Sequence, residues 1–240
     1  HDVDRVIHLG GLMGEEVQLR PYSGVRINVL GAVNVLEAAR LEGISRVVFG
    51  SSGTAYLGSL HDGIEKLDEG ISLKPSSLYG ATKATSEWLG GAYARRFGFD
   101  FFCVRYVGGL YGPSPTACKS TRERAIQAMV RAAMNGSPAN IKWPLGNIEL
   151  LYGKDAAKGA VLACLANKAK DRLFHIGSGE LVGGEDVLRA VRKQFPHVRI
   201  ELTEIPYPLP QRVAPILSDG SRAREQLGYE PVYALEKALV

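Results

Sequence analysis

Arg46-Val47-Val48-Phe49-Gly50-Ser51-Ser52 is the stretch of the 240-residue chain that decides its fold. It is a short apolar run that ends in small residues, as a strand buried on both faces does. Two other runs share this texture, at residues 5–11 and 101–107. Strands that are apolar on both faces are typical of parallel sheets covered by helices. The sequence therefore predicts buried parallel strands at these three places.

The segments between these runs carry helical patterns. Apolar side chains recur at helical spacing over residues 22–41, and a long helix is predicted over residues 77–97, ending in two arginines, a phenylalanine and a glycine. The alternation of strands and helices predicts an α/β fold, with an open, mostly parallel sheet and helices on both faces. Ligands of such sheets bind beyond the carboxyl ends of the strands, and here those ends carry small residues at 10–11, 51–52 and 107–108.

The C-terminal half has a different pattern of apolar and polar residues, which predicts a smaller lobe. Helical patterns alternate there with short strand-like runs, the helices at about 119–135, 153–167 and 183–195 and the strands at 172–177 and 198–203. The sequence contains no internal repeat and no low-complexity tract.

Composition excludes several classes of protein. The net charge is +4, and the basic residues are scattered rather than gathered on one face, so we expect no nucleic-acid partner. Cys103, Cys118 and Cys164 have neither disulfide nor metal-ligand spacing. No run approaches the roughly twenty apolar residues of a membrane span. We therefore expect a cytoplasmic protein with no membrane partner and no metal.

Tyr79 and Lys83 are residues whose types and spacing indicate a catalytic role. Their spacing places them on one face of the predicted helix. A phenol has a pKa of about 10, and a cation one turn away stabilises the phenolate and lowers that pKa. Tyr79 can then exchange a proton with a substrate hydroxyl or carbonyl, while a nearby serine holds that oxygen. Alone the pair also fits a surface tyrosine beside a solvated lysine. We expect Trp88 and Tyr93, on the same helix, to be core or helix-packing residues.

Several segments resemble, in order and spacing, the extended short-chain dehydrogenases, the NAD-dependent epimerase/dehydratase family. The matching segments are residues 6–11, 28–31, 49–56, 75–83, 111–113 and 218–231. The resemblance spans essentially the whole chain. It implies a Rossmann-like parallel sheet with a small C-terminal α/β substrate lobe. Residues 1–113 would form a partial dinucleotide-binding domain with the catalytic helix, and residues 114–240 mainly the substrate-binding lobe, with some segments returning to the Rossmann core.

The resemblance also implies a site. Tyr79 would be the acid/base, Lys83 would lower its pKa and bind the nicotinamide ribose, and Ser52 would hydrogen-bond the reacting oxygen. Asn28 would support the site through the helix behind it. Besides Tyr79 and Lys83, the predicted contacts with NAD or NADP, of which NAD is favoured, are Leu9, Gly10, Gly11, Asn28, Ser51 and Val107. Predicted substrate contacts are Ser52, Gly53, Thr54 and Arg212. A small-molecule substrate and a homodimer are the partners that the family implies.

The sequence departs from the family at its start. The Gly-x-x-Gly-x-x-Gly turn and roughly two βα units are not found within these residues, and the glycines at 10–14 lack the fingerprint spacing. Three explanations stay open: an omitted N-terminal segment, strands supplied by another chain, or a natural variant without dinucleotide binding. The first two leave an NAD(P)-dependent oxidoreductase or epimerase. The third makes the chain a cofactor-free binding or scaffold protein.

Substrate signals are weaker. Residues 107–110 lack the asparagine that nucleotide-sugar enzymes of the family carry before Tyr-Gly-Pro, and residues 148–155 keep only Asp155 of another family segment. Gly53 and Thr54 stand where dehydratases of the family have Asp and Glu, which disfavours simple dehydration. A sugar, a nucleotide sugar and a small hydroxy acid therefore remain competing substrates.

Overall fold

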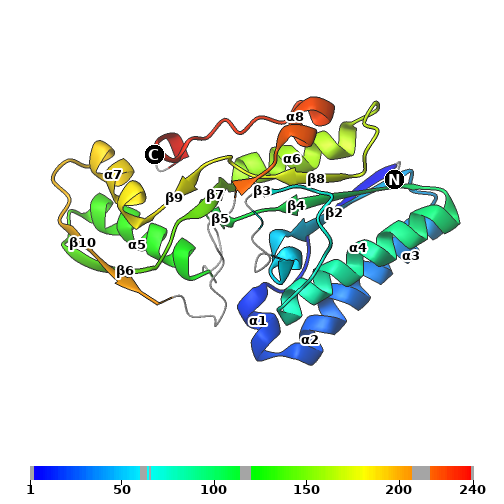
Figure 1. Ribbon diagram of the computed structural model, residues 1–240, viewed down its shortest axis with the longest axis horizontal. Coiled ribbons are helices and arrows are strands. Elements are labelled where there is room, and N and C mark those ends of the chain that lie inside the picture. Colours follow the sequence, from blue (N-terminus) through cyan, green and yellow to red (C-terminus); the bar gives the residue numbers. More distant parts are fainter. Residues whose placement is uncertain (1–2, 60–63, 65, 114–119, 207–216, 239–240) are drawn as a thin grey trace. The chain divides into compact units, whose positions relative to one another are not determined.

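The computed structural model describes residues 3–59, 64, 66–113, 120–206 and 217–238 (Figure 1). The chain divides into two compact units, each built from three stretches of sequence. Unit 1 comprises His1–Val107, Ala157–Ile176 and Ser218–Glu230, and unit 2 comprises Gly108–Ala156, Gly177–Leu217 and Pro231–Val240. The structural boundary thus falls between Val107 and Gly108. The dinucleotide-binding and substrate-binding roles of residues 1–113 and 114–240 stay predictions.

Unit 1 is built on a four-stranded parallel sheet. Its strand order is β1-β2-β4-β8. The strands are β1 (Arg5–His8), β2 (Arg46–Ser52), β4 (Asp100–Tyr106) and β8 (Leu173–Ile176). All three pairings are parallel, so the carboxyl ends of the strands meet at one edge of the sheet. The predicted Rossmann-like α/β fold with a parallel sheet is confirmed.

Helices cover both faces of this sheet. Figure 1 shows α3 and α4 side by side on one face and α6 and α8 on the other. Their bounds are α3 (Gly31–Leu41), α4 (Leu78–Phe97), α6 (Gly153–Leu165, in unit 1 from Ala157) and α8 (Ser221–Leu227). A core of aliphatic and aromatic side chains fills the space beneath α3 and α4, including Leu36, Val47, Phe49 and Phe101.

The helical run before β2 differs from the single helix predicted over residues 22–41. It consists of α1 (Gly14–Leu19), α2 (Pro21–Val25), a π-helical turn η1 (Arg26–Leu30) and α3. The buried Asn28 lies in the π turn. Such turns occur mostly as single-turn insertions and are frequent at functional sites. The spacing of apolar residues does not reveal this turn, because the Asn28 side chain in it is held by Leu12 and Thr82, which are distant in sequence.

Helix α4 has clear local signals at both ends. Ser77 caps its start by accepting a hydrogen bond from the Gly80 amide at 3.0 Å. Gly98 ends it in the left-handed conformation, with φ of 80°, which favours glycine. Tyr93 packs partly buried against the core, as expected. The expectation of a core position for Trp88 is wrong, because this side chain is 63% exposed. One residue after the inward-facing Glu87, the helix has turned by about 100° toward solvent.

The segment between β2 and α4 contains short elements. A 3₁₀ turn, η2 (Gly53–Tyr56), follows β2 directly. Strand β3 (Lys66–Leu67) pairs with β11 (Leu217–Ser218). No helix among the described residues is long and apolar enough to span a lipid bilayer.

Unit 2 packs helices on short strands around its own core. Its two small sheets have the orders β5-β7-β9 and β10-β6. The elements are β5 (Gly109–Tyr111), α5 (Thr121–Asn135), β6 (Ala139–Pro144), β7 (Ile148–Tyr152), β9 (Leu181–Val182), α7 (Gly184–Gln194), β10 (Ile200–Ile205) and α9 (Leu235–Ala238). The core includes Met129, Trp143 and Leu188. Strands β6 and β7 were not predicted, although Ile141 and Trp143 alternate with polar neighbours as in a half-buried strand.

Candidate active site

Ser52 and Tyr79 meet at the carboxyl end of β2. Tyr79 is buried in the first turn of α4, and the neighbouring Ser52 side chain lowers its pKa as a hydrogen-bond partner, against the effect of burial. Ser52 ends β2 and caps the η2 turn: its Oγ accepts hydrogen bonds from the Thr54 amide at 3.2 Å and from Thr54 Oγ1 at 3.0 Å. Because Thr54 fills the acceptor positions of Ser52, the Ser52 hydroxyl is oriented by its surroundings before any ligand arrives.

Lys83 lies one helical turn after Tyr79 on the same buried face. Its Nζ donates to the Gly50 carbonyl oxygen at 2.7 Å and lies 4.9 Å from the centre of the Phe49 ring. The same Nζ is 5.8 Å from the centre of the Tyr79 ring. Burial lowers the pKa of Lys83 to about 8. Burial raises the pKa of Tyr79, and the hydrogen bond with Ser52 opposes that rise.

Asn28 connects the segment after β1 to α4. Its Oδ1 accepts from the Leu12 amide at 2.7 Å, and its Nδ2 donates to the Leu12 carbonyl oxygen at 3.1 Å. The same Nδ2 also donates to Thr82 Oγ1 at 3.1 Å. Thr82 Oγ1 in turn donates to the Tyr79 carbonyl oxygen at 2.8 Å. The side chain in the π turn thus holds the segment after β1 against the helix that carries Tyr79 and Lys83.

The glycines after β1 leave room beside this cluster. Leu9, Gly10 and Gly11 are exposed. A Cβ at Gly11 would lie 3.0 Å from Asn28 Oδ1 and 3.8 Å from Lys83 Nζ, so a larger residue there would crowd both side chains. His8, just before them, is half-buried, and its Nε2 has no hydrogen-bond partner among the described residues. Burial and the nearby Lys83 lower the pKa of His8, so this nitrogen lies in a largely dehydrated, positively charged setting.

The other predicted residues lie close by in the fold, with one exception. Gly53 packs on Val107, since a Cβ at Gly53 would be 3.3 Å from the Val107 Cα. Ser51 is buried, and its hydroxyl donates to Glu87 Oε1 of α4. Arg212, one of the predicted substrate contacts, lies outside the described residues. Within the part of the chain that the structure describes, no group of three or more His, Cys, Asp or Glu side chains gathers to hold a metal ion.

Sequence reasoning missed Glu87 and Arg105. Glu87 is buried on α4, and Arg105 is buried on β4. Arg105 Nε donates to Glu87 Oε1 at 2.9 Å and to Oε2 at 3.1 Å, and its Nη2 donates to Oε2 at 2.5 Å. The spacing of Glu87, four residues after Lys83, was the available signal, because it places both on one helical face.

Comparison with known proteins identifies relatives across nearly the whole chain. The sequence profile described as the NAD dependent epimerase/dehydratase family matches residues 1–177. UDP-glucose 4-epimerase of Corynebacterium glutamicum is 26% identical over 256 residues, which cover 98% of this chain and 73% of the relative.

Two solved structures share the fold. The UDP-glucose 4-epimerase of Thermus thermophilus, solved in complex with NAD, has a TM-score of 0.81 at 24% identity, and the match covers 99% of this chain and 75% of that one. The RMD protein of Pseudomonas aeruginosa, complexed with NADPH, has a TM-score of 0.83 at 20% identity, with coverages of 98% and 79%. The profile match, which takes in β1, β2 and α4, shows that the chain belongs to the NAD dependent epimerase/dehydratase family.

Proposed function

We propose that this chain forms the catalytic part of an NAD(P)-dependent oxidoreductase or epimerase that acts on a secondary alcohol or carbonyl. The observation that carries the proposal is the buried pair of Tyr79 and Lys83, with Lys83 Nζ 5.8 Å from the centre of the Tyr79 ring and Ser52 beside Tyr79. Family membership supports the use of this cluster for redox chemistry on a carbon–oxygen bond.

Tyr79 moves the proton in this proposal. In oxidation its phenolate takes the proton of the substrate hydroxyl, and in reduction its phenol returns a proton to the carbonyl oxygen. Burial opposes ionisation of Tyr79, and Ser52 favours it. We propose that the charge of the Lys83 ammonium adds to the effect of Ser52. The Ser52 hydroxyl, held by Thr54, hydrogen-bonds the same substrate oxygen and orients it toward Tyr79.

The residues at the strand ends fit a nicotinamide cofactor. The exposed glycines after β1 permit close approach, and His8 Nε2, which has no partner within the described ranges, lies next to them. When bound, the nicotinamide ring would exchange a hydride with the substrate carbon. Leu9, Gly10, Gly11, Ser51, Val107 and Lys83 would hold the cofactor, with Asn28 behind them. NAD is the favoured form, which the family description and the NAD-bound Thermus structure support.

The proposed substrate is a sugar, a nucleotide sugar or a small hydroxy acid. The name of the Corynebacterium relative supports the nucleotide sugar. Ser52, Gly53, Thr54 and Arg212 are the proposed substrate contacts. Gly53 and Thr54 offer no carboxylate beside Ser52, so we propose oxidation or epimerisation rather than dehydration.

We further propose that the protein is a cytoplasmic homodimer. The exposed indole of Trp88 on α4 supports this assembly, because a large aromatic side chain on a helix surface gains stability when a second copy covers it.

Isothermal titration of the full-length protein with NAD and with NADP tests the proposed cofactor. We expect binding in the micromolar range, tighter for NAD. Absence of binding by either nucleotide at millimolar concentration would refute the proposed function and favour a cofactor-free binding protein.

A further inference from the structure

Tyr79, Lys83 and Glu87 form one buried row along α4. Each follows the previous one by four residues, and their exposed fractions are 8%, 6% and 9%. Residues at this spacing lie above one another on the helix surface. The proposed function uses Tyr79 and Lys83, and it leaves a buried carboxyl group unexplained.

Glu87 joins three elements at the carboxyl edge of the sheet. Its Oε1 accepts from Ser51 Oγ of β2 and, at 2.9 Å, from Arg105 Nε of β4. Ser51 and Arg105 are directly paired in the register of the two strands. The Glu87 carboxyl group of α4 therefore binds β2 and β4 at two residues that lie opposite each other. Lys83 binds β2 one residue earlier, because its Nζ donates to the carbonyl oxygen of Gly50.

A purely structural role does not require a charge at this position. Replacing a buried ion pair with apolar residues of similar size is often neutral or stabilising. The helix α4 already packs closely on β4, since a Cβ at Gly90 would lie 2.1 Å from the Phe101 ring. The charge of Glu87 therefore points to a use beyond packing.

Lys83 is the group on which the Glu87 charge acts. Burial lowers the pKa of Lys83 to about 8, and Cys103 and then Glu87 are the groups whose negative charge, when present, opposes this shift. The other titratable groups that face Lys83 are His8 from β1, Cys103 from β4 and Tyr79 from α4 itself. Burial raises the pKa of the Cys103 thiol well above its ordinary value, which leaves Cys103 uncharged near neutral pH. Glu87 is thus the anion among these groups.

The Glu87 carboxyl has the surroundings that an anion needs. Burial raises its pKa to about 7, whereas the hydrogen bonds with Ser51 and Cys103 and the charge of Lys83 favour its ionised form. The fork of hydrogen bonds from Arg105 favours the ionised form as well.

We infer that Glu87 is a positioning residue of the proposed site, which ties β2 and β4 to α4 and keeps the Lys83 ammonium charged beside Tyr79. The inference rests on the proposed function for the use made of Lys83. The ionisation of Lys83 can be measured without turnover, so the two claims can fail separately.

Nuclear magnetic resonance of lysine labelled with ¹³C at Cε measures this ionisation directly, with Lys83 assigned by its loss in Lys83→Arg. We expect Glu87→Gln to lower the pKa of Lys83 by about one unit. The exposed Glu42→Gln, in the same unit, is the matched control and should leave it unchanged. The double variant Glu87→Met/Arg105→Met removes both buried charges without stranding Arg105, and it should also lower the pKa of Lys83.

The outcomes separate the two claims. If the protein turns over its substrate, the alkaline limb of the pH profile of kcat should move to lower pH in both Glu87 variants. In each variant this shift should equal the fall in the pKa of Lys83. A lowered pKa of Lys83 in a protein without cofactor binding supports the role of Glu87 and refutes the proposed function. An unchanged pKa of Lys83 in folded variants overturns the inference. Failure of both variants to fold also overturns it, since it assigns the pair to stability alone.

Discussion

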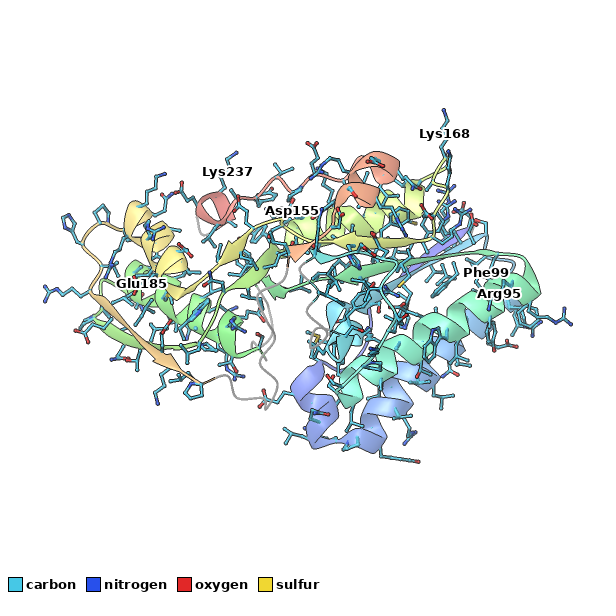
Figure 2. The ribbon with its side chains drawn as sticks, viewed as in Figure 1. Arg95, Phe99, Asp155, Lys168, Glu185 and Lys237 are labelled. Atoms are coloured by element: carbon cyan, nitrogen blue, oxygen red, sulfur yellow. The ribbon has the colours of Figure 1, made fainter. Side chains whose placement is uncertain are left out.

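Unit 1 and unit 2 both bury charged side chains, and they use them for partly different tasks. In unit 2 the carboxylate of Asp155, labelled in Figure 2, accepts hydrogen bonds from the amides of Val232 and Tyr233, at 2.9 Å each. Glu149 accepts from the Gly179 amide at 2.8 Å. These carboxylates anchor backbone segments that have no regular partner, as buried polar groups in many folds do.

In unit 1 buried charged side chains also hold backbone groups, as Lys83 does at the Gly50 carbonyl oxygen, but several of them bind one another as well. Glu87 pairs with Arg105, and the Arg105 guanidinium lies 4.6 Å from the centre of the Tyr56 ring. The Tyr56 hydroxyl in turn lies 2.9 Å from His175 Nε2. Burying such groups costs free energy that packing alone does not require. Both units thus use buried charge to hold the chain, and unit 1 in addition maintains an electrostatic environment beside Tyr79 and Lys83.

The largest expected effect tests the packing of unit 2. Trp143 is 1% exposed in the core of that unit, so Trp143→Ala should lower the free energy of unfolding by about 3–5 kcal/mol. Met134, 69% exposed in the same unit, is the control, and Met134→Ala should change it by less than about 0.5 kcal/mol. Urea unfolding measures both. Equal losses in the two variants would contradict the burial described for these two side chains.

The next effect tests the electrostatic role of unit 1. Lys83→Met removes the cation beside Tyr79 and should lower kcat by about a hundredfold or more. Lys158, also in unit 1, donates through its Nζ to the backbone oxygen of Glu230 at 3.1 Å and serves as the matched control. Lys158→Met should retain kcat within about a factor of two. Steady-state assays of both variants measure kcat. Retained turnover in Lys83→Met would contradict the proposed role of Lys83.

A smaller effect is a pH dependence that unit 1 imposes on stability. Burial lowers the pKa of His175 to about 3 in the folded chain, whereas an unfolded histidine takes up its proton near pH 6.5. The folded pKa is the lower one, so this contribution to stability is complete above pH 6.5 and is lost as the pH falls toward 3. Between pH 7 and pH 5 the loss should be about 2 kcal/mol.

Urea unfolding of wild type and His175→Gln at the two pH values isolates this contribution. Glutamine keeps an amide that can bond the Tyr56 hydroxyl, and it does not titrate. The variant should lose about 2 kcal/mol less than wild type on acidification. The same loss in both proteins would show that His175 does not govern the fall in stability at acidic pH.

Much of unit 1 could be predicted from the sequence, because its signals are local. The apolar run that ends in Ser51-Ser52 marked β2 at the bounds that the structure gives, and the arginines and glycine around residue 98 marked the end of α4. The family resemblance assigned Ser52 and Tyr79 to one site, and in the structure the two side chains are neighbours.

Features that depend on tertiary contacts could not be predicted in this way. The π turn at Asn28 is held by Leu12 and Thr82, which are distant in sequence. The pairing of Glu87 with Arg105 follows from the register of β2 and β4 and from the packing of α4, none of which has a sequence signal of its own. Strand β6 is a different case, because it has a local signal, the alternation at Ile141 and Trp143, that the sequence prediction missed.

The central claim is that Tyr79 is the acid/base of an NAD(P)-dependent enzyme. Measuring turnover and cofactor binding in Tyr79→Phe tests it most directly. Tyr93→Phe, which removes a phenol hydroxyl from the same helix, is the control. We predict that Tyr79→Phe lowers kcat by about 10² to 10⁴ while it keeps the Kd for NAD within a few fold and the melting temperature unchanged. Tyr93→Phe should behave as wild type. Wild-type turnover in Tyr79→Phe would contradict the claim.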